Sequence, residues 1–332
     1  MHPTEHFIPG KDASLEASIV TLQSRLEAIG FHVEERSWLN PVEGVWSVHI
    51  RDRDCPLLFT NGKGASELAA RASALGEYFE RASTNYFWTH FYLGETIANR
   101  DYVHHPDERW FAVDGDAWPD TLLTPELHDF YNPDGAVRAD QLIDLNSGNT
   151  GRGICAIPYQ RLADGETVYF PVNVIGNLYV SNGMSAGNTL QEARTQALSE
   201  IFERHIKLRI IRDELCLPDV PEDVIHRYPH IAAGVHALRD AGFGILVKDA
   251  SLGGRYPVMN VTLLHPDDQG CFASFGAHPR FEVALERALT ELLQGRALDA
   301  LAGFPAPGFD QTEIADPQNL EIHFVDSSGV IS

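Results

Sequence analysis

Positive charge is scarce in this sequence. Its 332 residues include 25 Lys and Arg against 47 Asp and Glu, which gives a formal net charge of −22. Surfaces that bind nucleic acids need Lys and Arg to contact the phosphate backbone, so the composition argues against such a surface while leaving room for one local basic pocket. Most of the acidic excess is typical of a surface that keeps a protein in solution.

Cysteine, long apolar runs and targeting signals are also lacking. The four cysteines are far apart and form no C-x-x-C pair, which argues against a structural zinc site built on thiolates and fits a reducing compartment; they are Cys55, Cys155, Cys216 and Cys271. No apolar run approaches the length of a membrane span, and the N-terminus carries no apolar signal region. We therefore expect a cytoplasmic protein without membrane contact.

The sequence does contain a repeated helical pattern. Residues 74–81 read ALGEYFER and residues 197–204 read ALSEIFER, so both share Ala-Leu-x-Glu-x-Phe-Glu-Arg. Residues 288–295, ALTELLQG, are a weaker copy in which Glu291 matches the first carboxylate and Gln294 replaces the second. The copies are too far apart for a short-period solenoid. They predict three related helices, at residues 66–84, 189–212 and 280–299.

Helical periodicity assigns two faces to each of these helices. The predicted apolar stripes are Leu68, Ala72, Leu75, Phe79 and Ala82 on the first helix, Leu198, Ile201 and Phe202 on the second, and Leu285, Leu289, Leu292 and Leu293 on the third. The polar faces are Ser73, Glu77 and Glu80, then Glu192, Gln196, Glu200 and Glu203, then Arg287, Glu291 and Gln294. Small residues beside these faces would let a ligand approach closely, namely Ala70, Ser73, Gly76 and Ser199.

Converging carboxylate faces need cations, because like charges repel. The helices lack the Glu-x-x-His pattern of di-iron bundles and offer no nearby Cys or His ligands for zinc. Ligand sets made of oxygen atoms suit Mg²⁺ or Mn²⁺, and Mg²⁺ is usually shared with substrate phosphates. Arg204 and Arg287 would then bind phosphate through their guanidinium groups. The alternative is an ordinary solvated helix face.

Two glycine-containing segments precede the first two helices. FTNGKGAS (59–66) and VSNGMSAGNT (180–189) each contain Asn-Gly, and such turns can direct backbone N–H groups toward an anion. Neither matches the P-loop pattern, and hairpin turns with helix caps explain either one equally well. Lys11, in PGKD, is a candidate phosphate contact that could also be a plain surface lysine.

The remaining pattern indicates an α/β or α+β protein with a mixed sheet. Asp12 is the predicted cap of a first helix that runs to about Ala28 and stops at Gly30. Residues 100–150 are predicted to be a loop-rich insertion. Further strands are expected at residues 44–60, 168–180, 244–250, 256–265 and 271–276, and a short helix at 221–241. No linker is evident, so we expect one composite domain.

Several motifs, taken together, resemble the YcaO family. They are, in order, GKDASLEASI, FTNGKGAS, ALGEYFER, VSNGMSAGNT, ALSEIFER and FGAHPRFEVALERALTELLQGR, and the resemblance runs from about Phe7 to Ser332. It implies a YcaO-like ATP-binding fold in which ATP lies among the three helices and Mg²⁺ bridges its phosphates. The metal-binding positions that it implies are Glu77, Glu80, Glu192, Glu200 and Glu203. The nucleotide contacts that it implies are Lys11, Ser18, Ser73, Asn188, Arg204, Arg287 and Glu291.

The resemblance also implies a chemistry. Family members use ATP to activate a backbone amide oxygen, which leaves as phosphate after a nucleophile attacks the amide carbon. The stand-alone branch is associated with β-methylthiolation of an aspartate on a small-subunit ribosomal protein. This implies a peptide or ribosomal protein substrate and a modification enzyme as partners; the sequence identifies no catalytic residue and leaves a homodimer open.

The family's pattern continues beyond what this sequence contains. The chain ends at IHFVDSSGVIS, so we expect residues 1–332 to be a YcaO-type ATP-binding domain that is shorter than its complete form, without the C-terminal helical-repeat domain. The first interpretation is a Mg²⁺-dependent, ATP-using enzyme. The second is a non-catalytic ATP-binding accessory protein, and the third is a structural protein with salt-bridged helices.

Overall fold

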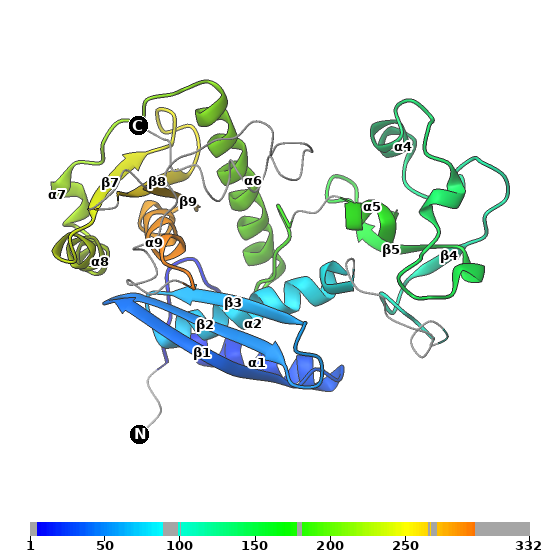
Figure 1. The fold of residues 1–332 in the computed structure, drawn as a ribbon, viewed down its shortest axis with the longest axis horizontal. Coiled ribbons are helices and arrows are strands. Elements are labelled where there is room, and N and C mark those ends of the chain that lie inside the picture. Colours follow the sequence, from blue (N-terminus) through cyan, green and yellow to red (C-terminus); the bar gives the residue numbers. More distant parts are fainter. Residues whose placement is uncertain are drawn as a thin grey trace. The chain divides into compact units, whose positions relative to one another are not determined.

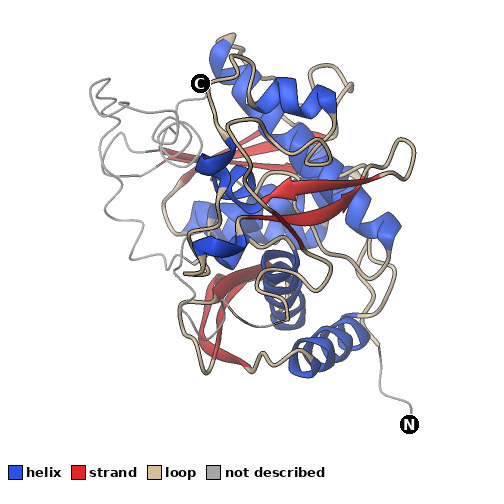
Figure 2. Cartoon of the chain, turned by 90° about the vertical axis from the view of Figure 1, so that its right-hand side faces the viewer, coloured by secondary structure: helices blue, strands red, loops and turns tan. Residues whose placement is uncertain are grey.

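The computed structural model describes residues 5–88, 99, 101–177, 181–264, 266 and 271–295. The chain divides into two compact units, one made of Met1–Glu80 with Asn182–Ser332 and the other of Arg81–Ser181. The described strands form three three-stranded sheets with helices beside them (Figures 1 and 2). This confirms the expected α+β class, but every described strand pairing is antiparallel rather than mixed, because each strand pairs with the strand next to it in the sequence.

The first sheet lies in the first unit, beside two helices. The sheet contains β1 (Val33–Val42), β2 (Val45–Asp52) and β3 (Phe59–Gly64), and the helices are α1 (Leu15–Ala28) and α2 (Glu67–Ser83). The helix predicted at 66–84 is thus confirmed. Two predictions were wrong. Ser14, rather than Asp12, caps α1, because its hydroxyl accepts from the Ala17 N–H at 3.2 Å. The turn expected at Asn-Gly in FTNGKG instead continues β3, since the edge of β2 offers its backbone a partner; the strand pair expected at 44–60 is confirmed by β2 and β3.

The second sheet of this unit is enclosed by helices on both faces. It contains β7 (Gly244–Asp249), β8 (Val258–Leu264) and β9 (Cys271–Ala277); the helices of this region are α6 (Leu190–Arg212), α7 (Glu222–Ile225), α8 (Pro229–Asp240) and α9 (Phe281–Leu292). Side chains of α8 and α9 share one apolar core with this sheet, and α6 contributes Ile206 and Ile210 to a separate core with Val258 and Phe275. Helix α9 therefore lies against one face of the sheet and α6 against the other (Figure 1).

The predicted apolar stripes have mixed outcomes. The stripe of α9 is confirmed, since Leu285, Leu289, Leu292 and Leu293 are all buried. The stripe of α6 was wrong, because Leu198, Ile201 and Phe202 are 55%, 43% and 37% exposed. On α2 the buried residues are mainly small, namely Ala69, Ala70, Ala74, Leu75 and Tyr78, so only Leu75 of the predicted stripe is buried.

Close packing on glycine explains which face α2 buries. A Cβ atom on Gly62 would lie less than 3.0 Å from the Ala70 carbonyl oxygen and the Ala74 nitrogen, and the Thr60 hydroxyl donates to the Ala74 carbonyl oxygen at 2.9 Å. The alanines thus let α2 touch the backbone of β3. Ala70 was expected to leave space for a ligand, but β3 fills the space beside it.

The same packing recurs in the other two copies. A Cβ on Gly276 of β9 would be equally close to the Ala284 oxygen and the Ala288 nitrogen, and Ser274 donates to the Ala288 oxygen at 2.5 Å. At the start of α6, Gly187 faces the Ala193 nitrogen in this way. In α2 and α9 the glycine faces the first alanine of the repeat, Ala74 and Ala288, so Glu77 and Glu291 follow it at the same spacing. In α6 the glycine faces Ala193, one helical turn before Ala197, so the sequence repeat is a structural repeat in α2 and α9, and in α6 the close contact is displaced by one turn.

The second unit is built around a small sheet. It contains β4 (Arg109–Phe111), β5 (Ile154–Gln160), β6 (Thr167–Pro171), α4 (Pro125–Tyr131), α5 (Val172–Asn177) and short 3₁₀ turns at Tyr86–Trp88, Ala139–Leu142 and Thr150–Arg152. The strand predicted at 168–180 was wrong for residues 172–177, which form α5 with Val172 and Ile175 buried at helical spacing, and residues 178–180 lie outside the described residues. Among the described residues of both units, no helix is long and apolar enough to cross a membrane.

Candidate functional site

Lys63 of β3 marks the point where three helices of the first unit come together. Its ammonium pairs with the Glu291 carboxylate of α9. The other carboxylates that act on it most strongly are Glu203 and Glu200 of α6 and Glu77 of α2. Residues from all three copies of the repeat therefore surround one cation, although they are far apart in the sequence.

Burial decides the charge states in this cluster. It lowers the pKa of Lys63 to about 8, even though Glu203 and Glu77 favour the charged ammonium. It also raises the pKa of the Glu203 carboxyl above its ordinary value, against the attraction of Lys63 and Arg287. Charges interact more strongly where water is partly excluded, so an added cation would change the charge balance of the cluster.

Two arginines accompany the carboxylates. Arg287 of α9 donates to the Ala277 carbonyl oxygen at 3.0 Å and to the Gln196 side chain of α6, so it joins β9, α6 and α9. Burial lowers the Arg287 pKa, opposed by the charge of Glu203, but a guanidinium stays protonated in proteins. On α6, Arg204 Nε lies 3.8 Å from a Glu200 oxygen. Both arginines predicted to contact phosphate thus face the carboxylate cluster.

Glu192 is the centre of a second set of contacts, at the start of α6. One of its oxygens accepts from Lys11 Nζ at 2.9 Å, and the other accepts from the Asp12 backbone N–H and from Asn188 Nδ2, each at 3.0 Å. Burial alone would raise the Glu192 pKa, but the Lys11 charge and these hydrogen bonds lower it below its ordinary value. Ser18 of α1 extends the network by donating to Asn188 Oδ1 at 2.8 Å.

These contacts show the surroundings of Glu192 and its neighbours, whose predicted ligand-binding roles they do not test. Glu192 holds Lys11 and Asn188 in place, which a positioning residue would do, and its role as a metal ligand stays a prediction. Ser73 and Glu80, the other predicted site residues of α2, lie about one helical turn before and after Glu77 and are half-buried. Their predicted contacts to nucleotide and metal also stay predictions.

Sequence reasoning missed two residues of this region. Lys63 lies inside FTNGKGAS, a segment that its glycines predicted to be a turn. Side chains alternate between the two faces of a strand, so a strand with Gly62 and Gly64 facing α2 places Lys63 on the opposite face. His278 is 6% exposed and lies against Gly10, where the absence of a Cβ atom leaves room for the imidazole. Burial and the nearby Arg287 lower the His278 pKa to about 4, so this side chain is neutral at pH 7.

The donor set fits a hard divalent cation. The groups around Lys63 are carboxylates from α2, α6 and α9, and carboxylate oxygen atoms are the ligands that Mg²⁺ prefers. The neighbouring guanidinium groups of Arg204 and Arg287 suit phosphate oxygens. A site that combines acidic and basic groups in this way can accommodate a nucleotide phosphate together with a metal ion.

The described fold and this site agree with a family of ATP-dependent proteins. Residues 61–330 match the model of the YcaO cyclodehydratase family, which is described as binding ATP and Mg²⁺. The chain belongs to the YcaO family. This confirms the family expected from the motifs and, with it, the expected ligand class of ATP and Mg²⁺.

Two curated relatives are similar along almost the whole chain. The ribosomal protein S12 methylthiotransferase accessory factor YcaO of Escherichia coli (strain K12) is 58% identical over 330 residues, which are 99% of this chain and 56% of that protein. An uncharacterised protein of Haemophilus influenzae is 58% identical over 98% of this chain and 56% of its own length. The chain thus spans about half the length of these relatives.

Solved structures show the same fold at low sequence identity. A heterocyclase in complex with substrate and cofactor has a TM-score of 0.55 and 19% identity, over 88% of this chain and 41% of that protein. The YcaO protein of Methanopyrus kandleri, bound with AMPPCP and Mg²⁺, has a TM-score of 0.53 and 19% identity, over 96% of this chain and 76% of that protein. These likenesses concern the fold.

Proposed function

We propose that this chain binds ATP with Mg²⁺ at the carboxylate cluster around Lys63 and uses it to activate a backbone amide. The observation that carries the proposal is the convergence of Glu77, Glu200, Glu203 and Glu291 on one half-buried cation, Lys63, beside Arg287. The carboxylates would repel each other without a cation, so added positive charge would stabilise a site of this composition.

Each group in the site has a role in this proposal. Glu77, Glu200 and Glu203, with Glu80 beside them, would hold Mg²⁺, which neutralises the carboxylates and the nucleotide phosphates when bound. Arg204 and Arg287 bind and orient phosphate oxygens, since a guanidinium matches them bidentately.

The residues around Glu192 would also contribute to nucleotide binding. Glu192 holds Lys11 and Asn188 in place, so that Lys11 can offer its ammonium to the ligand. Ser18 and Ser73 supply hydroxyl groups, and Glu291 together with Lys63 adjusts the local charge. The neutral imidazole of His278 fills the space between the PGKD loop and Arg287 without adding charge.

The biological role that we propose is β-methylthiolation of a small-subunit ribosomal protein, in the cytoplasm, together with a modification enzyme. The support is the 58% identity to a protein named as an accessory factor for ribosomal protein S12 methylthiolation. That name favours a second candidate function, an ATP-binding accessory protein that does not turn over ATP. Release of ADP or phosphate without any partner would support the enzyme, and tight binding without release would support the accessory protein.

Isothermal titration calorimetry tests the binding step. ATP added to the chain in the presence of Mg²⁺ should give saturable heat at one site, and removal of Mg²⁺ should weaken the affinity strongly because the phosphates would then meet uncompensated carboxylates. ADP with Mg²⁺ is a matched comparison for the contribution of the terminal phosphate. Saturable binding of equal strength with and without Mg²⁺ would contradict the assigned role of the carboxylates.

A further inference from the structure

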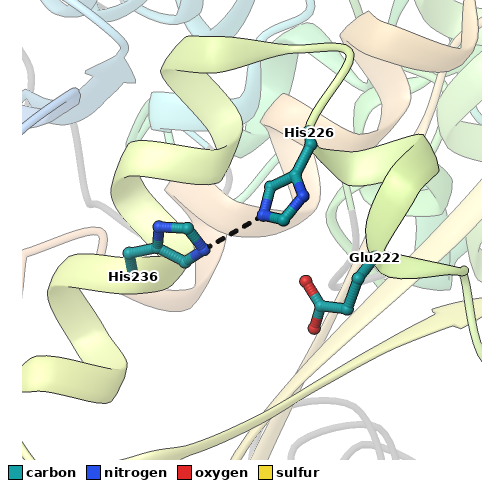
Figure 3. A group of neighbouring side chains, drawn as sticks. All are labelled: Glu222, His226 and His236. Atoms are coloured by element: carbon teal, nitrogen blue, oxygen red, sulfur yellow. Dashed lines mark hydrogen bonds between the residues drawn. The ribbon is translucent and has the colours of Figure 1, made fainter.

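Glu222, His226 and His236 form a compact group on helices α7 and α8, outside the carboxylate cluster. One ligand atom from each residue lies within 4.8 Å of the other two, and all three side chains are exposed. Figure 3 shows the carboxylate and both imidazoles directed toward one space between the two helices. Glu222 begins α7, His226 follows the end of that helix, and His236 belongs to α8.

The two imidazoles have the separation that a shared metal ion requires. His226 Nε2 and His236 Nε2 are 3.4 Å apart. Zinc binds imidazole nitrogen at roughly 2.0–2.1 Å with tetrahedral angles, which places two such nitrogens about 3.4 Å apart. A hydrogen bond between nitrogen atoms at this distance is long, so the pair gains little from facing each other without an ion.

The carboxylate completes a ligand set but has a competing partner. One Glu222 oxygen accepts from Arg239 of α8 at 2.6 Å, and this hydrogen bond lowers the Glu222 pKa. The carboxylate is therefore ionised and held near the imidazoles. Arg239 also places a positive charge beside the position that a metal ion would take, which opposes metal binding.

We propose that Glu222, His226 and His236 form a transition-metal site, suited to Zn²⁺, that joins α7 to α8. Two imidazoles and one carboxylate are a common set of three protein ligands for zinc, with a fourth position for water or a residue from a partner. The site has nitrogen ligands and lies apart from the oxygen-rich cluster around Lys63, so the two sites select different metals.

Competition for Zn²⁺ between the protein and a chromogenic zinc chelator tests this site. Excess Mg²⁺ is present so that it occupies the carboxylate cluster. The wild-type chain should take up one equivalent of Zn²⁺ that His226→Ala and His236→Ala each lose. Removing an outer partner of a metal ligand lowers affinity roughly 10–100-fold, so loss of a direct ligand should cost at least as much. His32→Ala is the matched control, since His32 is an exposed histidine whose Nδ1 lies 3.0 Å from the Asp54 carboxylate and which belongs to no group of three metal-ligating side chains in the part of the chain that the structure describes.

Two further variants separate a ligand from a mere neighbour. Glu222→Gln should weaken Zn²⁺ affinity. Arg239→Met should strengthen it, because Arg239 is a cation that competes with the metal ion for the carboxylate, unlike an outer partner that makes a ligand more basic. The three ligand side chains are exposed and Arg239 is half-buried, so circular dichroism should show folded variants, and Zn²⁺ should raise the Tm of the wild type but not of His226→Ala. Equal Zn²⁺ affinity in the wild type and both histidine variants would overturn the proposal, as would weaker binding in Arg239→Met.

Discussion

At the residue scale, Glu200 contributes negative charge to a site that holds several carboxylates. Glu200→Gln keeps the size of the side chain and removes that charge. We expect the Mg²⁺-dependent affinity for ATP to fall. The free energy of unfolding of the ligand-free protein should change by less than about 0.5 kcal/mol or rise, because the lost attraction to Arg204 is weak at 3.8 Å and less repulsion remains among the carboxylates. Calorimetric titration and urea unfolding measure the two effects.

Arg287→Ala should move stability in the other direction. The substitution leaves the Ala277 carbonyl oxygen and the Gln196 side chain without their donor, so the ligand-free protein should lose about 1–3 kcal/mol of unfolding free energy. Affinity for ATP should fall by about 1.5–3 kcal/mol, the usual value for one charged hydrogen-bonding group. If both Arg287→Ala and Glu200→Gln bind ATP as the parent does, the assigned site is wrong.

Lys63 should give stability a distinctive pH dependence. Its pKa is about 8 in the folded protein against an ordinary 10.5, so between these values the unfolded chain binds more protons than the folded one. Stability should therefore rise with pH through this window, relative to a variant that cannot titrate there. The measurement is the difference in unfolding free energy between the wild type and Lys63→Met from pH 7 to pH 10.5.

Lys63→Arg is the control for that pH dependence. Arginine keeps the positive charge opposite Glu291 but does not lose its proton in this range, so the variant should lack the rise while it retains the ion pair. A wild-type curve that runs parallel to both variants would show that Lys63 keeps an ordinary pKa and is less buried than the structure indicates.

At the scale of elements, Gly62 of β3 and Gly76 of α2 should respond in opposite ways to the same substitution. Gly62→Ala would push a methyl group into the Ala70 backbone and separate α2 from β3, so we expect a loss of about 3 kcal/mol or more. Gly76→Ala, within α2, meets no atom within 4 Å and should gain about 0.5–1 kcal/mol from better helix propensity. Chemical unfolding compares both, and similar effects would refute the packing explanation.

The incorrect predictions of the apolar stripes of α2 and α6 also concern individual elements. Periodicity identified where α2 and α6 lie, and both helices end within a residue or two of the prediction. Periodicity could not identify the buried faces of these helices. On α2, close contact with β3 requires alanine in place of larger side chains, and on α6 Leu198 is exposed although it lies on the predicted apolar stripe. Hydrophobic size predicts burial only where the neighbouring element is not already in backbone contact.

For the molecule as a whole, ATP with Mg²⁺ should raise the Tm. A ligand that binds only the folded state stabilises it by mass action, by about 2.7 kcal/mol at a concentration one hundred times Kd. Differential scanning fluorimetry at increasing ATP concentration measures this shift, and Glu200→Gln should respond less at each concentration. A Tm that stays constant at saturating ATP and Mg²⁺ would contradict an intact nucleotide site in this chain.

The sequence by itself determined the helices that carry the carboxylates, their matching phase and the family, because these depend on local spacing and ordered motifs. The tertiary structure decided which faces are buried, that β3 brings Lys63 to the carboxylates, and that Lys11 and Asn188 meet at Glu192. It also decided that His226 and His236 face each other from separate helices. These outcomes depend on contacts between residues far apart along the chain or on separate elements, and on the cost of burying charge, neither of which is encoded in a local pattern.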